Sequence, residues 1–114
     1  MAKLELIEAN DTLTHVALRG RLDISGVGEV ELPLTAQTVA RRKPTIIDLC
    51  DVDVLASIGI GMLVKIARSL HSHGLMVVVV AKGISRENLE RLKVNEIFPI
   101  VATSDEALQI LMVD

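Results

Sequence analysis

The chain has 114 residues, a length typical of one domain built around a single hydrophobic core. Its net charge of −3 and its single aromatic residue, Phe98, provide neither the basic surface nor the stacking side chains of nucleic-acid-binding proteins. The longest apolar run, residues 75–81, is far shorter than the roughly 20 residues that span a bilayer, and the N-terminus lacks a signal-peptide stretch. We therefore expect a cytoplasmic protein that binds neither nucleic acid nor a membrane.

The chain opens with two segments of alternating polar and apolar residues, 3–8 and 12–19, on either side of a turn-forming pair, Asn10 and Asp11. This pattern predicts a β-hairpin at a sheet edge. His15 then lies on the exposed surface of a strand, and we assign it no chemical role.

The spacing of apolar residues over 25–42 predicts a helix. Pro33 lies inside this segment and should interrupt or kink the helix, because proline lacks an N–H group and its ring clashes with the preceding turn. A short β-branched segment, residues 45–49, then predicts a strand. The positions that set the helical spacing are Val27, Val30, Leu34, Thr38 and Val39.

A polar loop, residues 50–56, leads into Ser57, which we interpret as the N-cap of a second helix. Gly59 and Gly61 are interpreted as packing residues that let the start of this helix approach a neighbouring backbone closely. Gly74 is expected to end the helix as its C′ residue. The apolar stripe of the helix consists of Ile58, Met62, Leu63, Ile66, Ala67 and Leu70.

The last third of the chain predicts two strands and two helices. Residues 75–81 form an unalternating, valine-rich run, which is typical of a strand buried on both faces of a sheet. A short helix over residues 85–92, capped by Ser85, leads to a last strand at 98–101. Residues 103–106 form a capping box at the start of a final helix.

Taken in order, these elements predict a single α/β domain over residues 1–114. Its sheet is mixed and mostly parallel, with an antiparallel N-terminal strand, and about four helices accompany it.

Known catalytic motifs do not fit this sequence. Cys50 follows a strand, but a phosphatase loop would need an arginine where the chain has Ala56. A hydrolase nucleophile elbow around Ser57 would need glycine in place of Leu55. The two glycines that follow lack the lysine of a P-loop and the third glycine of a dinucleotide fingerprint.

Metal-dependent and redox functions are also disfavoured. Asp48 could be the acceptor of a receiver-like domain, but the chain lacks the second acidic cluster and the final lysine of such domains. His71 and His73 are two residues apart and would diverge on a helix, and a single cysteine makes no CxxC site. We expect no enzyme, no catalytic residue, no metal and no cofactor.

Four segments carry a family resemblance and occur in order along nearly the whole chain. They are Gly-Arg-Leu-Asp at residues 20–23, Ile-Ile-Asp-Leu at 46–49, Val-Leu-Ala-Ser-Ile-Gly-Ile-Gly-Met-Leu at 54–63 and Gly-Leu-Met-Val-Val-Val at 74–79. In these segments the chain resembles the STAS domain, the fold of bacterial anti-sigma factor antagonists and of the cytoplasmic tails of sulfate transporters. The lack of a transmembrane segment favours the antagonist branch.

The resemblance implies a phosphorylation site at Ser57. The family's acceptor serine usually stands in an Asp-Ser-Ser-Gly motif, and the aligned residues here are Ala56, Ser57, Ile58 and Gly59. The acceptor and the glycine are kept, whereas the acid and the second serine are replaced. A phosphoserine would place about −1.5 to −2 charges at a helix N-terminus, where backbone N–H groups and the helix dipole tolerate them.

The resemblance also implies a partner, an anti-sigma factor that is at the same time a serine kinase and that binds the ATP. The unphosphorylated antagonist would sequester this kinase and free a sigma factor for transcription in a bacterial stress response, and phosphorylation of Ser57 would release the kinase. The expected partner-binding residues gather at one end of the sheet; they are Asp23, Asp53, Ser57, Ile58 and Gly59.

Three alternatives stay open at this point. The chain could be a scaffold subunit of a stress-signalling complex, in which Ser57 tunes assembly. It could be an enzyme or small-ligand binder, which the missing catalytic groups disfavour. Ser57 could also be a helix cap and nothing more. The oligomeric state does not follow from the sequence.

Overall fold

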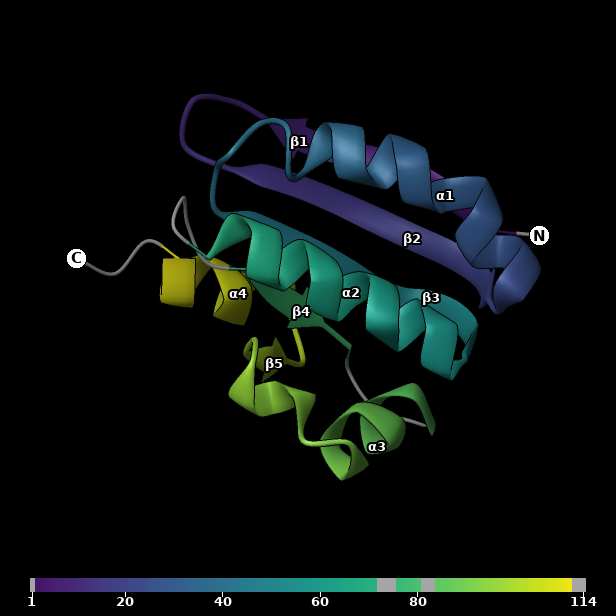
Figure 1. The fold of residues 1–114 in the computed structure, drawn as a ribbon. Helices are drawn as coiled ribbons and strands as arrows, with labels where there is room; N and C mark the ends of the chain where they lie inside the picture. The colour runs from purple at the N-terminus through teal and green to yellow at the C-terminus, as the bar shows by residue number, and fades with distance from the viewer. Residues whose placement is uncertain (1, 72–75, 81–83, 112–114) are drawn as a thin grey trace.

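The structure, a computed structural model, describes residues 2–71, 76–80 and 84–111, with the side chains of residues 84 and 85 excepted. Within these residues a five-stranded sheet is packed against helices on both of its faces (Figure 1). The elements in chain order are β1 (Ala2–Ala9), β2 (Thr14–Leu22), α1 (Ile24–Gln37), β3 (Thr45–Leu55), α2 (Ser57–Leu70), β4 (Met76–Val79), α3 (Ile84–Arg91), the 3₁₀ turn η1 (Val94–Glu96), β5 (Ile100–Val101) and α4 (Ser104–Leu111).

The strands lie in the sheet in the order of the sequence, β1-β2-β3-β4-β5. β1 is antiparallel to β2, and the remaining neighbours are parallel. Each pair of parallel neighbours is therefore joined by a crossover helix: α1 joins β2 to β3, α2 joins β3 to β4, and α3 joins β4 to β5. Right-handed crossovers that all advance in the same direction place their helices on the same face of the sheet. The predicted fold class, a mixed and mostly parallel α/β sheet with an antiparallel entry, is confirmed.

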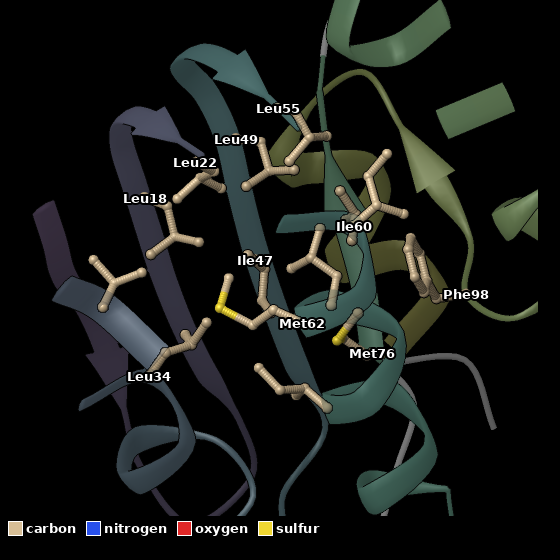
Figure 2. Close-up of a cluster of buried hydrophobic side chains, with 14 of the residues drawn as sticks. Leu18, Leu22, Leu34, Ile47, Leu49, Leu55, Ile60, Met62, Met76 and Phe98 are labelled. Atoms are coloured by element: carbon tan, nitrogen blue, oxygen red, sulfur yellow. The ribbon is translucent and has the colours of Figure 1, made fainter. Parts of the chain in front are cut away.

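The core has two parts, one on each face of the sheet. The larger part joins α1, α2 and α3 to the sheet, and Figure 2 shows its aliphatic side chains with Phe98 at one side. The smaller part lies between β3, β4, β5 and α4. β4 contributes Met76 and Val78 to the first part and Val77 and Val79 to the second, so the predicted strand buried on both faces is confirmed where it is described.

β3 is longer than the sequence suggests. The strand continues to Leu55, whereas residues 50–56 were expected to form a loop. Parallel pairing with β2 continues to Leu55 and provides hydrogen-bond partners for the backbone, with two register shifts along the pair. Asp51, for example, is exposed beside Arg19, with 3.7 Å between its Oδ2 and Arg19 Nε.

α1 continues through Pro33 and ends at Gln37, so the expected interruption at this proline is wrong. Pro33 is exposed and removes one intrahelical hydrogen bond, whereas Val30 and Leu34 on either side are buried against the sheet. Packing of this apolar face thus outweighs the cost of the proline.

His15 was expected on the surface of the sheet, but the structure shows it half-buried. The strand β2 is flanked by β1 and β3, and His15 pairs with Glu8 on one side and Ile46 on the other. Its ring is half-buried, and Nε2 is shielded from solvent without a hydrogen-bond partner among the described residues. Burial lowers the pKa of His15, although Asp48 and Glu8 partly oppose this effect by attracting a positive charge.

The last elements agree with the prediction except at their ends. α3 begins at Ile84, one residue before the expected cap Ser85, and β5 is confined to Ile100–Val101. The capping box is confirmed, because Thr103 Oγ1 accepts a hydrogen bond of 3.1 Å from the Glu106 N–H group. The predicted helix end at Gly74 lies outside the described residues.

Candidate functional site

The carboxyl ends of β2 and β3 meet at one edge of the sheet, on the right in Figure 1. Leu22 is paired with Leu55, and the Ala56 N–H group donates to the Leu22 carbonyl at 3.0 Å. Because the two strands are parallel, the residues that follow them begin α1 and α2 at the same edge. The structure therefore brings Asp23 and Ser57 to one end of the molecule.

Asp23 is fixed as the N-cap of α1. Its Oδ1 accepts a hydrogen bond of 3.0 Å from the Gly26 N–H group, and its Oδ2 accepts one of 3.2 Å from Arg21 Nε. The Gly26 hydrogen bond, followed by that from Arg21, lowers the pKa of Asp23 below its ordinary value. Asp23 is thus an oriented negative charge at this edge.

Ser57 is the first residue of α2 and is exposed. It is not the N-cap, as the sequence suggested: Ala56 holds that position in an extended conformation, with φ −81° and ψ 167°, and its carbonyl accepts from Gly59 and Ile60. The hydrogen bond from the Ala56 N–H group to the Leu22 carbonyl keeps Ala56 extended, and α2 begins directly after it at Ser57, one residue earlier than expected. The Ser57 hydroxyl makes no hydrogen bond among the described residues, and the first turn of α2 carries no acidic side chain.

The two glycines of α2 differ in their surroundings. A Cβ atom on Gly59 would lie 2.9 Å from the Leu22 carbonyl oxygen, so a close approach of α2 to β2 requires glycine there, as predicted. Gly59 is buried and lies behind the exposed surface of the site. A Cβ atom on Gly61 would meet nothing within 4 Å, so the packing role expected for Gly61 is wrong.

Two isoleucines are exposed at this edge. Ile58 follows Ser57 and is 44% exposed, whereas Ile24 follows Asp23 and is 78% exposed. Ile24 was not expected at the site, because it lies just before the predicted helix, which covered residues 25–42. Asp53 is also exposed, but it lies within β3 and not in a loop after the strand.

A cleft of about 420 Å³ opens beside Ser57, between the start of α2 and α3. The α3 side contributes polar groups that the sequence analysis did not single out, the Asn88 amide and the Arg91 guanidinium. Both residues lie far along the chain from Ser57, so only the folded structure brings them together. The full lining is Leu55, Ala56, Ser57, Ile60, Asn88, Arg91 and Leu92.

The chemistry of this cleft is that of a surface for binding or modification. Its lining includes one hydroxyl group but neither a carboxylate nor an imidazole that could act as its general base. A second hollow of about 500 Å³, formed by α3, η1 and β5, has no hydroxyl or thiol in its lining, which consists of Arg86, Glu90, Lys93, Asn95, Glu96 and Ile100. The described residues hold no cluster of three or more potential metal ligands and no helix long and apolar enough to cross a membrane.

Comparison with protein families decides the classification. The family model of the STAS domain matches residues 5–107. The chain belongs to the STAS domain family. The resemblance predicted from the sequence is confirmed, and the site described above lies within the matched residues. No curated protein sequence matches the chain.

Several solved structures share the fold over nearly the full length of the chain. An anti-sigma factor antagonist from Mycobacterium paratuberculosis is 24% identical, with a TM-score of 0.90 over 99% of this chain and 96% of the other. An anti-sigma factor antagonist domain protein from Planctomyces limnophilus is 20% identical, with a TM-score of 0.79 over 97% of this chain and 98% of the other. The phosphorylated form of the Bacillus cell fate determinant SpoIIAA is 16% identical, with a TM-score of 0.69 over 95% and 98%.

Proposed function

We propose that this STAS protein is an anti-sigma factor antagonist whose partner binding is switched off by phosphorylation of Ser57. The observation that carries the proposal is the exposed Ser57 hydroxyl, which opens α2 at the same edge as Asp23 and makes no hydrogen bond among the described residues. The STAS fold, shared with proteins described as anti-sigma factor antagonists, supports the proposal.

The proposed partner is an anti-sigma factor that is also a serine kinase. It supplies both ATP and the general base, because the cleft beside Ser57 offers no base of its own. The γ-phosphorus forms a bond to Ser57 Oγ, its bond to the ADP oxygen breaks, and the hydroxyl proton passes to the base of the kinase. The STAS protein is then a substrate and not an enzyme.

Phosphorylation weakens the complex through charge placed among apolar contacts. In the unphosphorylated protein, Ile24 and Ile58 offer exposed apolar surface whose burial favours association. A phosphate on Ser57 adds about −1.5 to −2 charges next to Ile58 and at the same edge as the negative Asp23. Burying this charge in an interface carries a desolvation cost that the unphosphorylated form does not have.

In this role the protein works in the bacterial cytoplasm. Its binding to the anti-sigma factor frees a sigma factor and so promotes transcription in a stress response, and phosphorylation reverses this partner switch. The surface formed by Asp23, Asp53, Ser57 and Ile58, with Gly59 behind it, is the proposed docking surface.

Incubation with the cognate kinase and Mg-ATP tests the proposal. Intact-mass spectrometry should show one added phosphate on the wild type and none on Ser57→Ala. Ser69→Ala is the matched control, because Ser69 is exposed near the opposite end of α2 and should leave phosphorylation unchanged. Phosphate at another residue, or none on the wild type, would contradict the switch and favour a scaffold subunit of a stress-signalling complex.

A further inference from the structure

We propose that, once Ser57 is phosphorylated, Arg91 of α3 pairs with the phosphate across the cleft within the same chain. The inference rests on the proposed function, because it concerns the phosphorylated state of the same serine. It adds an internal partner for the phosphate, which joins the start of α2 to the end of α3.

The cleft supplies the geometry. Ser57 and Ala56 line one side, and Asn88 and Arg91 line the other. Phosphorylation adds one phosphorus and three oxygen atoms to Ser57, and a cleft of about 420 Å³ is many times the roughly 30 Å³ that one water molecule occupies. The group can therefore enter the cleft without displacing the side chains of the core.

Of the two arginines in α3, Arg91 is the one that can bind the phosphate. Arg86, on the same helix, already pairs with Glu90 at 2.8 Å and donates to the Val80 carbonyl at 2.9 Å. Arg91 is exposed, and its guanidinium makes no ion pair or hydrogen bond among the described residues. A guanidinium presents paired N–H donors that match two phosphate oxygens, so Arg91 can bind the phosphate without breaking an existing contact.

Asn88 strengthens the same arrangement. It lies three residues before Arg91, and side chains with this spacing share one face of a helix. Its amide can donate to a third phosphate oxygen. On the opposite wall the first turn of α2 has no acidic side chain to repel the phosphate.

The internal ion pair has a consequence for the switch. The phosphate would be held by its own chain, and α3 would be linked to the docking edge only in the phosphorylated form. Arg91 would then be free in the active antagonist and engaged in the inactive one.

Phosphoserine placed at position 57 by genetic code expansion allows a test without any kinase. The ³¹P NMR titration of the phosphate is measured in the wild type, in Arg91→Gln and in Arg68→Gln. Arg68 is the matched control, because it is an exposed arginine in the last turn of α2, at the far end from Ser57. The phosphate should titrate about half a pH unit lower in the wild type and in Arg68→Gln than in Arg91→Gln, because a nearby cation favours the dianion.

Salt dependence and a second variant complete the test. The difference between the wild type and Arg91→Gln should shrink in about 1 M salt, where exposed charges are screened beyond roughly 3 Å. Asn88→Ala should shift the titration in the same direction as Arg91→Gln, by a smaller amount. Equal titration curves for the wild type and Arg91→Gln at low salt would overturn the inference. The two proposals fail separately. Equal titration curves exclude the Arg91 pair but not the switch, which stands if the kinase still modifies Ser57. Failure of the kinase to modify Ser57 excludes the switch but does not change the titration of a phosphoserine placed at position 57.

Discussion

The first turns of α1 and α2 lie at the same edge of the sheet but are built in opposite ways. α1 begins behind a charged cap, Asp23, whose carboxylate accepts the Gly26 N–H group. α2 begins behind Ala56, which offers no side-chain cap, and continues with an exposed serine. In the first turn of α1 a backbone N–H group donates to the Asp23 carboxylate, whereas no side chain caps the first turn of α2. The N–H groups at the start of α2 can therefore bind an added negative group. α2 therefore depends on packing and not on capping, and this leaves the Ser57 hydroxyl available for modification.

The largest expected effect tests whether packing holds α2 in place. Leu63 is fully buried in the core, so Leu63→Ala should lower the free energy of unfolding by about 2–5 kcal/mol. Leu32 on α1 is 82% exposed and serves as the control, with a loss of less than about 0.5 kcal/mol for Leu32→Ala. Urea denaturation measures both, and similar losses for the two variants would contradict the assigned faces.

The two glycines of α2 should respond in opposite ways to substitution by alanine. Gly59→Ala should cost about 1–3 kcal/mol, because its new methyl group would lie 2.9 Å from the Leu22 carbonyl oxygen. Gly61→Ala should instead stabilise the protein by about 0.5–1 kcal/mol, since space is open there and alanine favours helix. Chemical denaturation of the two variants separates these outcomes, and a stabilising Gly59→Ala would show that α2 does not need its close approach to β2.

Substitutions at Asp23 and Ser57 test whether only α1 depends on a side-chain cap. Asp23→Ala should lower the melting temperature, whereas Asp23→Asn should retain most of the stability, because asparagine also caps helices. Ser57→Ala should change the free energy of unfolding by less than about 0.5 kcal/mol, since Ser57 is exposed and caps nothing. A larger loss for Ser57→Ala than for Asp23→Ala would reverse the comparison.

The Asp23 contribution should also depend on pH. Its pKa in the folded protein is lower than the ordinary 3.8, so its stabilising effect is present above that value and is lost as the pH falls through the lowered pKa. Thermal melts of the wild type and Asp23→Asn across this acidic range should therefore converge at the lowest pH.

The smallest effect concerns His15, on the strand that precedes α1. Burial lowers the pKa of His15 from 6.5, so the folded protein favours the neutral ring. Its contribution to stability is complete above pH 6.5 and falls as the pH decreases through the lowered pKa of the folded state. Melting temperatures between pH 7 and 5 should decrease less in His15→Gln than in the wild type, and equal slopes would exclude this histidine as the cause.

Local patterns in the sequence predicted the parts of the fold that depend on local chemistry. The capping box at Thr103, most of the buried face of α2 and the valine-rich β4 each follow from residue type and spacing. At the start of α2 the predicted stripe is wrong, because Ile58 is exposed and Ile60 is buried. The end of β3 and the start of α2 could not be predicted in this way. Both depend on backbone pairing with β2, because the hydrogen bond from the Ala56 N–H group to the Leu22 carbonyl holds Ala56 extended as the N-cap, and Ser57 follows as the first helical residue.

The candidate site shows the same division. Ser57 and Asp23 could be found from the family motif and from their position after strands. Arg91 and Asn88 could not, because α3 is separated from Ser57 by a strand and most of a helix, and only the packed fold places them on one cleft. Ile24 was not found either, because it lies just before the predicted helix, which covered residues 25–42, although its side chain is exposed.

The proposed switch requires that the anti-sigma factor kinase bind the unphosphorylated protein more tightly than the phosphorylated protein. Isothermal titration calorimetry would compare the wild type with protein that carries phosphoserine at position 57. We expect the Kd of the phosphorylated form to be at least roughly tenfold higher, because the added charge lies in the docking surface. Equal affinities, or tighter binding of the phosphorylated form, would contradict it.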